Sequence, residues 1–170
     1  MTTAGRPRRS SQATIADAAA ELFIENSYAG TTIDQITQRA GVSRATFFNY
    51  FSAKTDLLWF DVDRAIEQLG AACDPAADLR TAVLEVAAGF GGRDVPLALS
   101  QQDVMGSTTE ILESGLVRVA ALAGVFRRSS DRTDAYVLAG AGSAGWLDWV
   151  RAGIGREPLT HYLESSLARV

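Results

Sequence analysis

Apolar side chains recur along this chain at spacings of three and four residues, and this spacing is the feature that most limits its fold. Such a pattern places the apolar side chains on one face of a helix, whereas a half-buried strand needs strict alternation. Only 4 prolines interrupt the 170 residues, so few positions forbid a helix. The sequence therefore predicts an all-α fold.

Several classes of protein are disfavoured by the composition. No window approaches the roughly 20 apolar residues of a membrane span, so we expect a soluble, cytoplasmic protein that does not bind a membrane. The single cysteine, Cys73, and the single histidine, His161, leave no pattern for a disulfide framework or a zinc site. We expect no cofactor and no metal. An enzyme with a helical fold is a weak alternative, because no nucleophile lies at a motif spacing from a base.

Charge is divided unevenly along the chain. Residues 1–54 carry 6 basic and 4 acidic side chains, whereas residues 55–170 carry 10 basic and 16 acidic ones. Basic character is thus confined to one end of a chain whose net charge is −4. This asymmetry permits a nucleic-acid-binding N-terminal module on an acidic body, although charge alone fits a solvated tail equally well.

The expected helices follow from caps and breaks. The first begins near Ser11, buries a face that includes Ile15 and Phe23 (with Ala19 and Leu22 between them), and ends near Asn26. Further helices are expected at about 54–70, 76–91, 95–105, 107–127, 131–153 and 158–169.

Two short helices separated by a tight turn are predicted between residues 32 and 51. Thr32 and Gln35 have the spacing of a capping box, and the helix that they open stops at Gly41. Ser43 caps a second helix of about two turns that runs through Tyr50. This order of cap, helix, turn, cap and helix is that of a helix-turn-helix.

In a helix-turn-helix the second helix enters the major groove of DNA. Phe47 and Phe51 are four residues apart and are expected to point inward, and Phe48 is also assigned mainly to the core. The outward positions can then face DNA; they are Arg44, Ala45, Thr46, Asn49 and Tyr50.

The segment resembles the TetR family of bacterial regulators over the run Thr32-Ile33-x-x-Ile36-x-x-x-Ala40-Gly41-Val42-Ser43-x-x-x-Phe47-Phe48-x-Tyr50-Phe51-x-x-Lys54-x-x-Leu57. The resemblance extends over about residues 10–60. Within the family, residues 47–59 are most similar to actinobacterial members, including the mycofactocin-associated regulators.

The resemblance implies a set of DNA contacts. The residues expected to contact phosphates are Thr32, Ser43, Tyr50 and Lys54, and those expected to read bases are Arg44, Thr46 and Asn49. The family often has tyrosine where this chain has Phe48, so one expected phosphate contact is in doubt.

The resemblance also implies the domain organisation. Residues 1–53 would form a three-helix DNA-binding domain, in which residues 1–10 are a flexible basic arm or a plain disordered tail. A connecting helix would join it to a helical effector-binding and dimerisation domain, residues 54–170. The expected activity is that of a repressor released from double-stranded operator DNA by a small effector. A DNA-binding regulator without a small-molecule effector is the alternative.

The effector pocket and the dimer interface are the least specified parts. An apolar or aromatic effector would suit a wall of Trp59, Phe90, Met105, Leu112, Tyr136, Trp146 and Trp149, although ordinary core packing explains each residue singly. The glycine-rich segment 139–145 suggests close helix packing, so residues 131–153 and 158–169 are expected to meet their two-fold mates in a homodimer. Its apolar flanks are Leu138, Leu147, Val150, Leu159, Leu163 and Leu167.

Overall fold

The computed structural model describes residues 11–72, 78–91 and 94–170, and all regular elements in these residues are helical. The predicted all-α fold is therefore confirmed. The basic arm expected at residues 1–10, and Cys73, lie outside the described residues. None of the described helices has the length and apolar character needed to cross a lipid bilayer.

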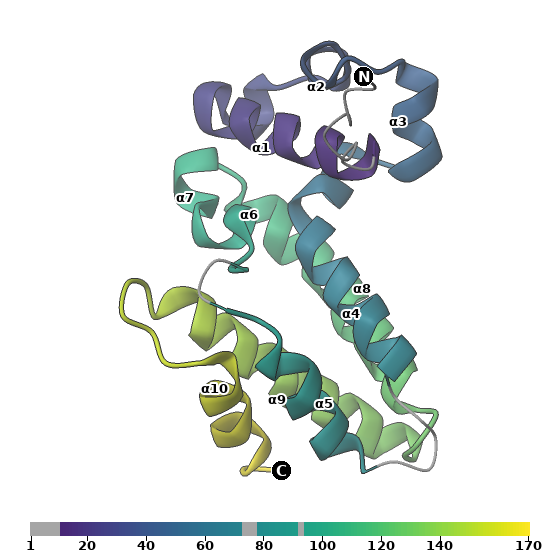
Figure 1. The fold of residues 1–170 in the computed structure, drawn as a ribbon, viewed down its shortest axis with the longest axis vertical. Coiled ribbons are helices and arrows are strands. Elements are labelled where there is room, and N and C mark those ends of the chain that lie inside the picture. Colours follow the sequence, from purple (N-terminus) through teal and green to yellow (C-terminus); the bar gives the residue numbers. More distant parts are fainter. Residues whose placement is uncertain (1–10, 73–77, 92–93) are drawn as a thin grey trace, which may run out of the picture.

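Three helices form one end of the molecule: α1 (Ser11–Gly30), α2 (Ile33–Ala40) and α3 (Arg44–Tyr50) (Figure 1). The rest of the described chain forms η1 (Lys54–Trp59), α4 (Phe60–Ala72), α5 (Leu79–Ala88), α6 (Leu97–Ser100), α7 (Gln102–Met105), α8 (Thr108–Phe126), α9 (Arg132–Arg151) and α10 (Leu159–Leu167). In Figure 1, α4 runs alongside α8 from the three-helix end towards a second layer made of α5, α9 and α10.

Some helix boundaries differ from the prediction. The first helix continues to Gly30, but Ser27 has φ 64° and ψ 164°, so regular helical geometry is interrupted one residue after the predicted end. Hydrogen bonds from Gly30 N to Ser27 Oγ and from Thr31 Oγ1 to Ser27 O hold this break. The helix expected at 95–105 is divided into α6 and α7 at Gln101, and the connecting helix begins as the 3₁₀ turn η1.

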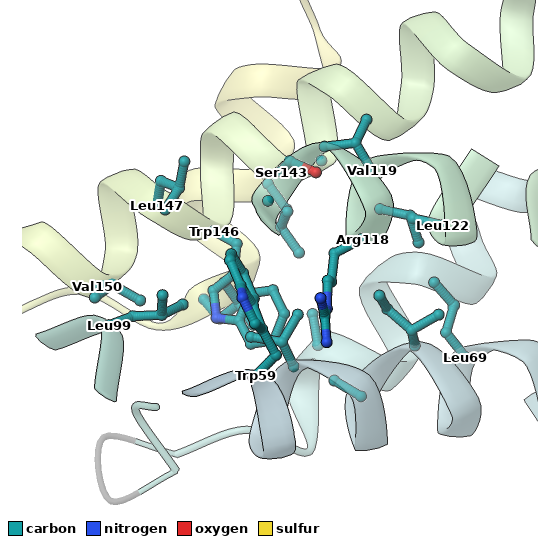
Figure 2. Close-up of a pocket in the computed structure, with 18 of the residues that line it drawn as sticks. Trp59, Leu69, Leu99, Arg118, Val119, Leu122, Ser143, Trp146, Leu147 and Val150 are labelled. Atoms are coloured by element: carbon teal, nitrogen blue, oxygen red, sulfur yellow. The ribbon is translucent and has the colours of Figure 1, made fainter. Parts of the chain in front are cut away.

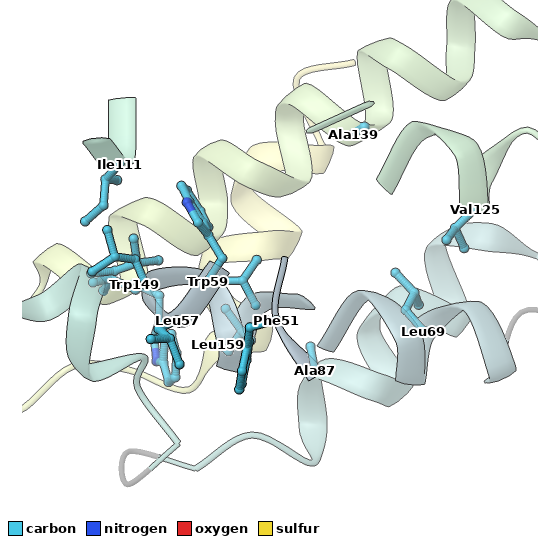
Figure 3. Packing of buried hydrophobic residues seen from close by; sticks show 14 of the residues in the cluster. Phe51, Leu57, Trp59, Leu69, Ala87, Ile111, Val125, Ala139, Trp149 and Leu159 are labelled. Carbon is cyan, nitrogen blue, oxygen red and sulfur yellow. The ribbon is translucent and has the colours of Figure 1, made fainter. Parts of the chain in front are cut away.

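One hydrophobic core runs through both ends of the molecule. The predicted inward face of α1 is confirmed, since Ile15, Ala19, Leu22 and Phe23 are all at most 4% exposed. Figure 3 shows this core continuing past Phe51 and Trp59 to Trp149 and Leu159, so the segment that follows α3 packs directly on the C-terminal body. The three-helix end and the C-terminal body are therefore joined by a continuous set of packed side chains.

The glycine-rich segment of α9 allows a close approach, but its partner is α10 of the same chain. A Cβ added at Gly145 would lie 2.9 Å from Tyr162 O and 3.2 Å from Leu163 Cα. The apolar residues expected to bury a dimer interface are likewise used inside the chain, because Val150, Leu159, Leu163 and Leu167 are at most 6% exposed. The expectation that these four side chains bury a dimer interface is therefore wrong, because they already pack within their own chain.

Candidate functional site

The predicted helix-turn-helix is present with each of its caps. Thr32 Oγ1 accepts from Gln35 N at 3.2 Å, and Gln35 Oε1 accepts from Thr32 N at 2.7 Å, which completes the capping box of α2. Gly41 has φ 66° and ψ 33°, the left-handed conformation that glycine adopts without strain. Ser43 Oγ then accepts from Thr46 N at 3.0 Å and caps α3. The angle between α2 and α3 is thus set by local hydrogen bonds.

Buried aromatic side chains fix α3 against the helices behind it. Phe47 is fully buried and Phe51 is 5% exposed, as predicted, and their ring centroids lie 5.6 Å apart. The assignment of Phe48 to the core is wrong, because Phe48 is 46% exposed and the Arg44 guanidinium lies over its ring at 5.4 Å. On a helix of 3.6 residues per turn, Phe48 lies about 100° around the axis from Phe47, so it stands at the edge of the buried face and here faces out.

The side chains predicted to contact DNA lie on the surface of this end of the molecule. Thr32, Ser43, Arg44, Asn49 and Tyr50 are exposed, and Thr46 is partly exposed. Ser43 Oγ and Thr46 Oγ1 are 2.9 Å apart, so the two hydroxyls form a hydrogen-bonded pair at the N-terminus of α3. An exposed helix N-terminus with hydroxyl groups can donate hydrogen bonds to an anion.

Arg44 is held by an acidic neighbour in the unbound protein. Its Nη1 lies 2.5 Å from Asp34 Oδ1 on α2, and both side chains are more than half exposed. Exposed ion pairs of this kind contribute only about 0–1 kcal/mol, so a phosphate or a guanine can compete for the guanidinium.

Lys54 has a structural role that the sequence did not indicate. Its Nζ donates to Tyr28 O at 2.7 Å and to Thr31 O at 2.8 Å, and lies 4.0 Å from the centroid of the Tyr28 ring. Partial burial lowers the pKa of Lys54, and Glu110 opposes this effect. The ammonium therefore joins the start of η1 to the C-terminal end of α1, where carbonyl groups lack helical partners.

A cavity of about 320 Å³ lies in the C-terminal body (Figure 2). Its wall comes from η1 and from α4 to α10, and includes Trp59, Ile66, Leu69, Val83, Phe90, Leu99, Ile111, Leu112, Leu116, Arg118, Leu122, Trp146, Leu147 and Leu163. The wall is almost entirely apolar, which favours a ligand whose body is apolar.

Four of the seven residues predicted for the pocket line this cavity: Trp59, Phe90, Leu112 and Trp146. The other three do not. Met105 and Trp149 are at most 1% exposed and pack elsewhere in the core, and Tyr136 is 46% exposed on the surface of α9. The helices of the body are apolar on more than one face, so spacing alone did not tell a pocket-facing aromatic residue from a core one.

A charged cluster joins the cavity wall to the segment that follows α3. Arg118 on α8 lines the cavity; its Nε and Nη2 donate to Asp63 at 3.2 and 3.1 Å, and Nη2 also donates to Asp56 Oδ1 at 3.3 Å. The other oxygen of Asp56 accepts from Ser52 N at 2.9 Å and from Ala53 N at 3.0 Å.

Sequence reasoning missed this cluster. Its signal was a lone arginine within the apolar run 115–126, because a charge in such a run is expected to be paired. The indole of Trp59 is fixed beside it: the Arg118 guanidinium lies 5.2 Å from that ring, and Trp59 Nε1 donates to Ser114 Oγ at 2.7 Å.

No group of three or more potential metal-ligating side chains occurs in the described part of the chain. The side chains present at the two sites can form hydrogen bonds, ion pairs and apolar contacts. The exposed end of α2 and α3 offers hydroxyl, amide and guanidinium groups, and the cavity offers apolar surface with a few donors.

Comparison with known proteins agrees with this geometry. Residues 15–58 match the family model described as bacterial regulatory proteins, tetR family. A protein of Mycobacterium tuberculosis named for the regulation of mycofactocin biosynthesis, MftR, is 34% identical over 65 residues, which cover 38% of this chain. The match spans only 33% of the length of that relative.

Solved structures share the fold over nearly the whole chain. The regulator SCO7518 of Streptomyces coelicolor has a TM-score of 0.56 at 20% identity, covering 94% of this chain and 98% of its own. NalD of Pseudomonas aeruginosa, the secondary repressor of the MexAB-OprM multidrug efflux pump, has a TM-score of 0.52 at 22% identity, covering 93% and 95%.

FadR of Thermus thermophilus, a TetR-family repressor solved with lauroyl-CoA, has a TM-score of 0.52 at 22% identity, covering 92% of this chain and 91% of its own. These structures share the helical architecture, and the family model matches the segment whose caps, turn and buried aromatic residues form the helix-turn-helix. Residues 15–58 of this chain are thus similar to bacterial regulatory proteins of the tetR family, and the whole chain shares their helical fold.

Proposed function

We propose that the protein is a homodimeric repressor that leaves its operator when a small, largely apolar effector occupies the cavity. Residues 1–53 would be the DNA-binding part and residues 54–170 the effector-binding and dimerisation part. The observation that carries this proposal is that Trp59 lines the cavity and belongs to η1, which starts only four residues after α3 ends at Tyr50. A ligand in the cavity therefore touches the segment that positions the recognition helix.

The DNA contacts proposed are those of an exposed α3 in the major groove. Arg44 and Asn49 have the donor and acceptor groups that read guanine and adenine, with Thr46 beside them. Thr32, Ser43 and Tyr50 would contact phosphates and set the register. For Lys54 we propose an indirect part, in which its bonds to Tyr28 O and Thr31 O orient η1 and any phosphate contact is additional.

The exposed face of α9 is the proposed centre of the dimer. Tyr136, Val137 and Leu147 are 46%, 44% and 37% exposed, and the exposed Gly140 and Ala144 lie between them on the same side of the helix. Because Gly140 and Ala144 at the middle of this exposed face are small, two α9 helices can cross closely there, with α10 beside them. A two-fold dimer would place two α3 helices for successive major grooves.

An effector response is favoured over a regulator that has no small-molecule ligand. The cavity of about 320 Å³ is in the range of ligand pockets, and Leu112 and Leu116 at its wall are 72% and 76% exposed. FadR, with the same fold, holds lauroyl-CoA, an acyl compound with a long apolar chain. An effector that fits one arrangement of the body better would shift α4 and change the separation of the two α3 helices.

Binding to DNA is tested by fluorescence anisotropy with a pooled genomic library and with fragments upstream of the gene itself, at two salt concentrations. We expect selective, salt-sensitive binding that is lost in Tyr50→Ala and Asn49→Ala. Val104→Ala is the matched control, because Val104 is exposed on α7. A protein that binds no duplex of the library would contradict the proposed function.

A further inference from the structure

Two hydrogen-bond donors in the cavity wall are unused. Trp146 Nε1 is buried and has no partner among the described residues. Arg118 donates from Nε and Nη2 to its two aspartates, and within the described chain its Nη1 donates no hydrogen bond. A buried donor without an acceptor costs about 1–3 kcal/mol, so Trp146 Nε1 favours a ligand that supplies an acceptor. Arg118 Nη1 offers the same ligand a charged donor in the same wall.

No acidic side chain of the cavity wall can act as the acceptor for these donors, within the described residues. Its charged residues are Arg118 and Arg151, and no carboxylate lines the cavity within the described residues. Figure 2 shows the Arg118 side chain reaching from its helix into the same space as Trp59 and Trp146. An apolar space with donors concentrated at one place fits a ligand with an apolar body and one compact polar group.

We propose that the effector carries an oxygen acceptor, a carboxylate or a carbonyl, which binds Nη1 of Arg118 and is also within the reach of Trp146. This inference rests on the proposed function, since it assigns the chemistry of the effector in the same cavity. The apolar body would lie against the side chains of α4, α5 and α8.

The same contact gives a route from the cavity to α3. Arg118 donates two hydrogen bonds to Asp63 but a single one, from Nη2, to Asp56. An acceptor that draws the guanidinium into the cavity would therefore loosen Asp56 first. Asp56 holds the backbone N–H groups of Ser52 and Ala53, directly after the end of α3. Arg118 is thus a positioning residue for the recognition helix as well as a ligand contact.

A matched pair of probes tests the ligand class. 8-Anilino-1-naphthalenesulfonate carries a sulfonate acceptor, and N-phenyl-1-naphthylamine is the same aromatic body without it. By fluorescence titration we expect the sulfonate to bind at least about tenfold more tightly, with the advantage lost in Arg118→Met and reduced in Trp146→Phe. Arg151→Met tests the other arginine of the wall. Arg127→Met is the control and should change neither affinity, because Arg127 is exposed at the end of α8 and does not line the cavity. Thermal melts establish that each variant is folded.

The outcomes separate the two proposals. If neither probe binds the wild-type protein, the cavity accepts no apolar ligand and the proposed effector response fails. If both bind equally well and Arg118→Met changes nothing, only the acceptor proposal is overturned. A loss confined to Arg151→Met would also overturn it, because the acceptor would then lie at the other arginine. If Arg118→Met does not fold, the test rests on whether Trp146→Phe reduces the advantage of the sulfonate probe.

Amide hydrogen exchange tests the route to α3. With saturating sulfonate probe, we expect faster exchange at Ser52 and Ala53 in the wild type and in Asp63→Asn. We expect no change in Asp56→Asn, whose amide oxygen can still accept from the backbone but whose charge no longer holds Arg118. Equal responses in the two asparagine variants would overturn the route through Asp56.

Discussion

The two ends of this molecule specify their structure in different ways. At the helix-turn-helix end, hydrogen bonds between residues three to five apart fix α2, the turn at Gly41 and α3. In the body, the decisive contacts join distant residues, as Arg118 does with Asp56 and Asp63. The structure of a short segment with local hydrogen bonds can therefore be predicted from its sequence. The structure of a packed helical body depends on contacts between distant residues.

The largest expected effect tests whether the stability of the helix-turn-helix end also depends on its buried core. Phe47→Ala removes a fully buried ring and should lower the free energy of unfolding by about 3–5 kcal/mol. Phe48→Ala, one residue along, removes a ring that is 46% exposed and should cost less than about 1 kcal/mol. Urea denaturation of both variants measures the difference. If Phe47→Ala lowered the free energy of unfolding as little as Phe48→Ala, the local caps alone would hold α3 in place.

A second pair of variants tests the packing of the body. Gly145→Ala places a Cβ 2.9 Å from Tyr162 O and should lower the free energy of unfolding by about 1–3 kcal/mol. Gly124→Ala meets nothing within 4 Å and should instead raise it by up to about 1 kcal/mol, because alanine favours the helix. Thermal melts compare the two. A stabilising Gly145→Ala would show that α9 and α10 can separate at little cost.

Two substitutions of the residue that caps α3 distinguish an effect on stability from an effect on DNA binding. Ser43→Ala loses the bond to Thr46 N and should cost about 1 kcal/mol of unfolding free energy. Ser43→Asp keeps a capping oxygen and should leave stability nearly unchanged while its charge weakens DNA binding. Denaturation and anisotropy are measured on the same samples. Unaltered DNA binding by Ser43→Asp would place Ser43 away from the phosphates.

The smallest expected effect is a dependence on acid pH. Hydrogen bonds from Arg39 hold the pKa of Glu25 below 4.5 and tie α2 to α1. A carboxyl group whose pKa is lower in the folded protein than in the unfolded chain stabilises the fold at pH values above the unfolded-state pKa. This stabilisation is lost as the pH falls through the folded-state pKa. Stability measured between pH 5 and 3 should thus fall slightly less in Glu25→Gln than in the wild type. Identical profiles would show that this exposed pair contributes nothing.

Much of the helix-turn-helix end was predictable from the sequence. The capping box at Thr32, the left-handed Gly41 and the cap at Ser43 were all expected from residue type and spacing. Phe48 was assigned to the wrong face because it stands at the edge of the apolar face of α3, where spacing does not decide between burial and exposure. The contacts of Lys54 were also missed, since its partners are backbone carbonyls at Tyr28 and Thr31, which no side-chain pattern reveals.

The sequence by itself determined the all-α class, the helix-turn-helix and its exposed face, because caps and turns depend on atoms a few residues apart. Only the tertiary structure decided which aromatic residues of the body face the cavity, that α9 meets α10 at Gly145, and that Arg118 reaches Asp56. The physical reason is that apolar burial is nearly non-directional, so helices that are apolar on several faces acquire their roles only when their neighbours are in place.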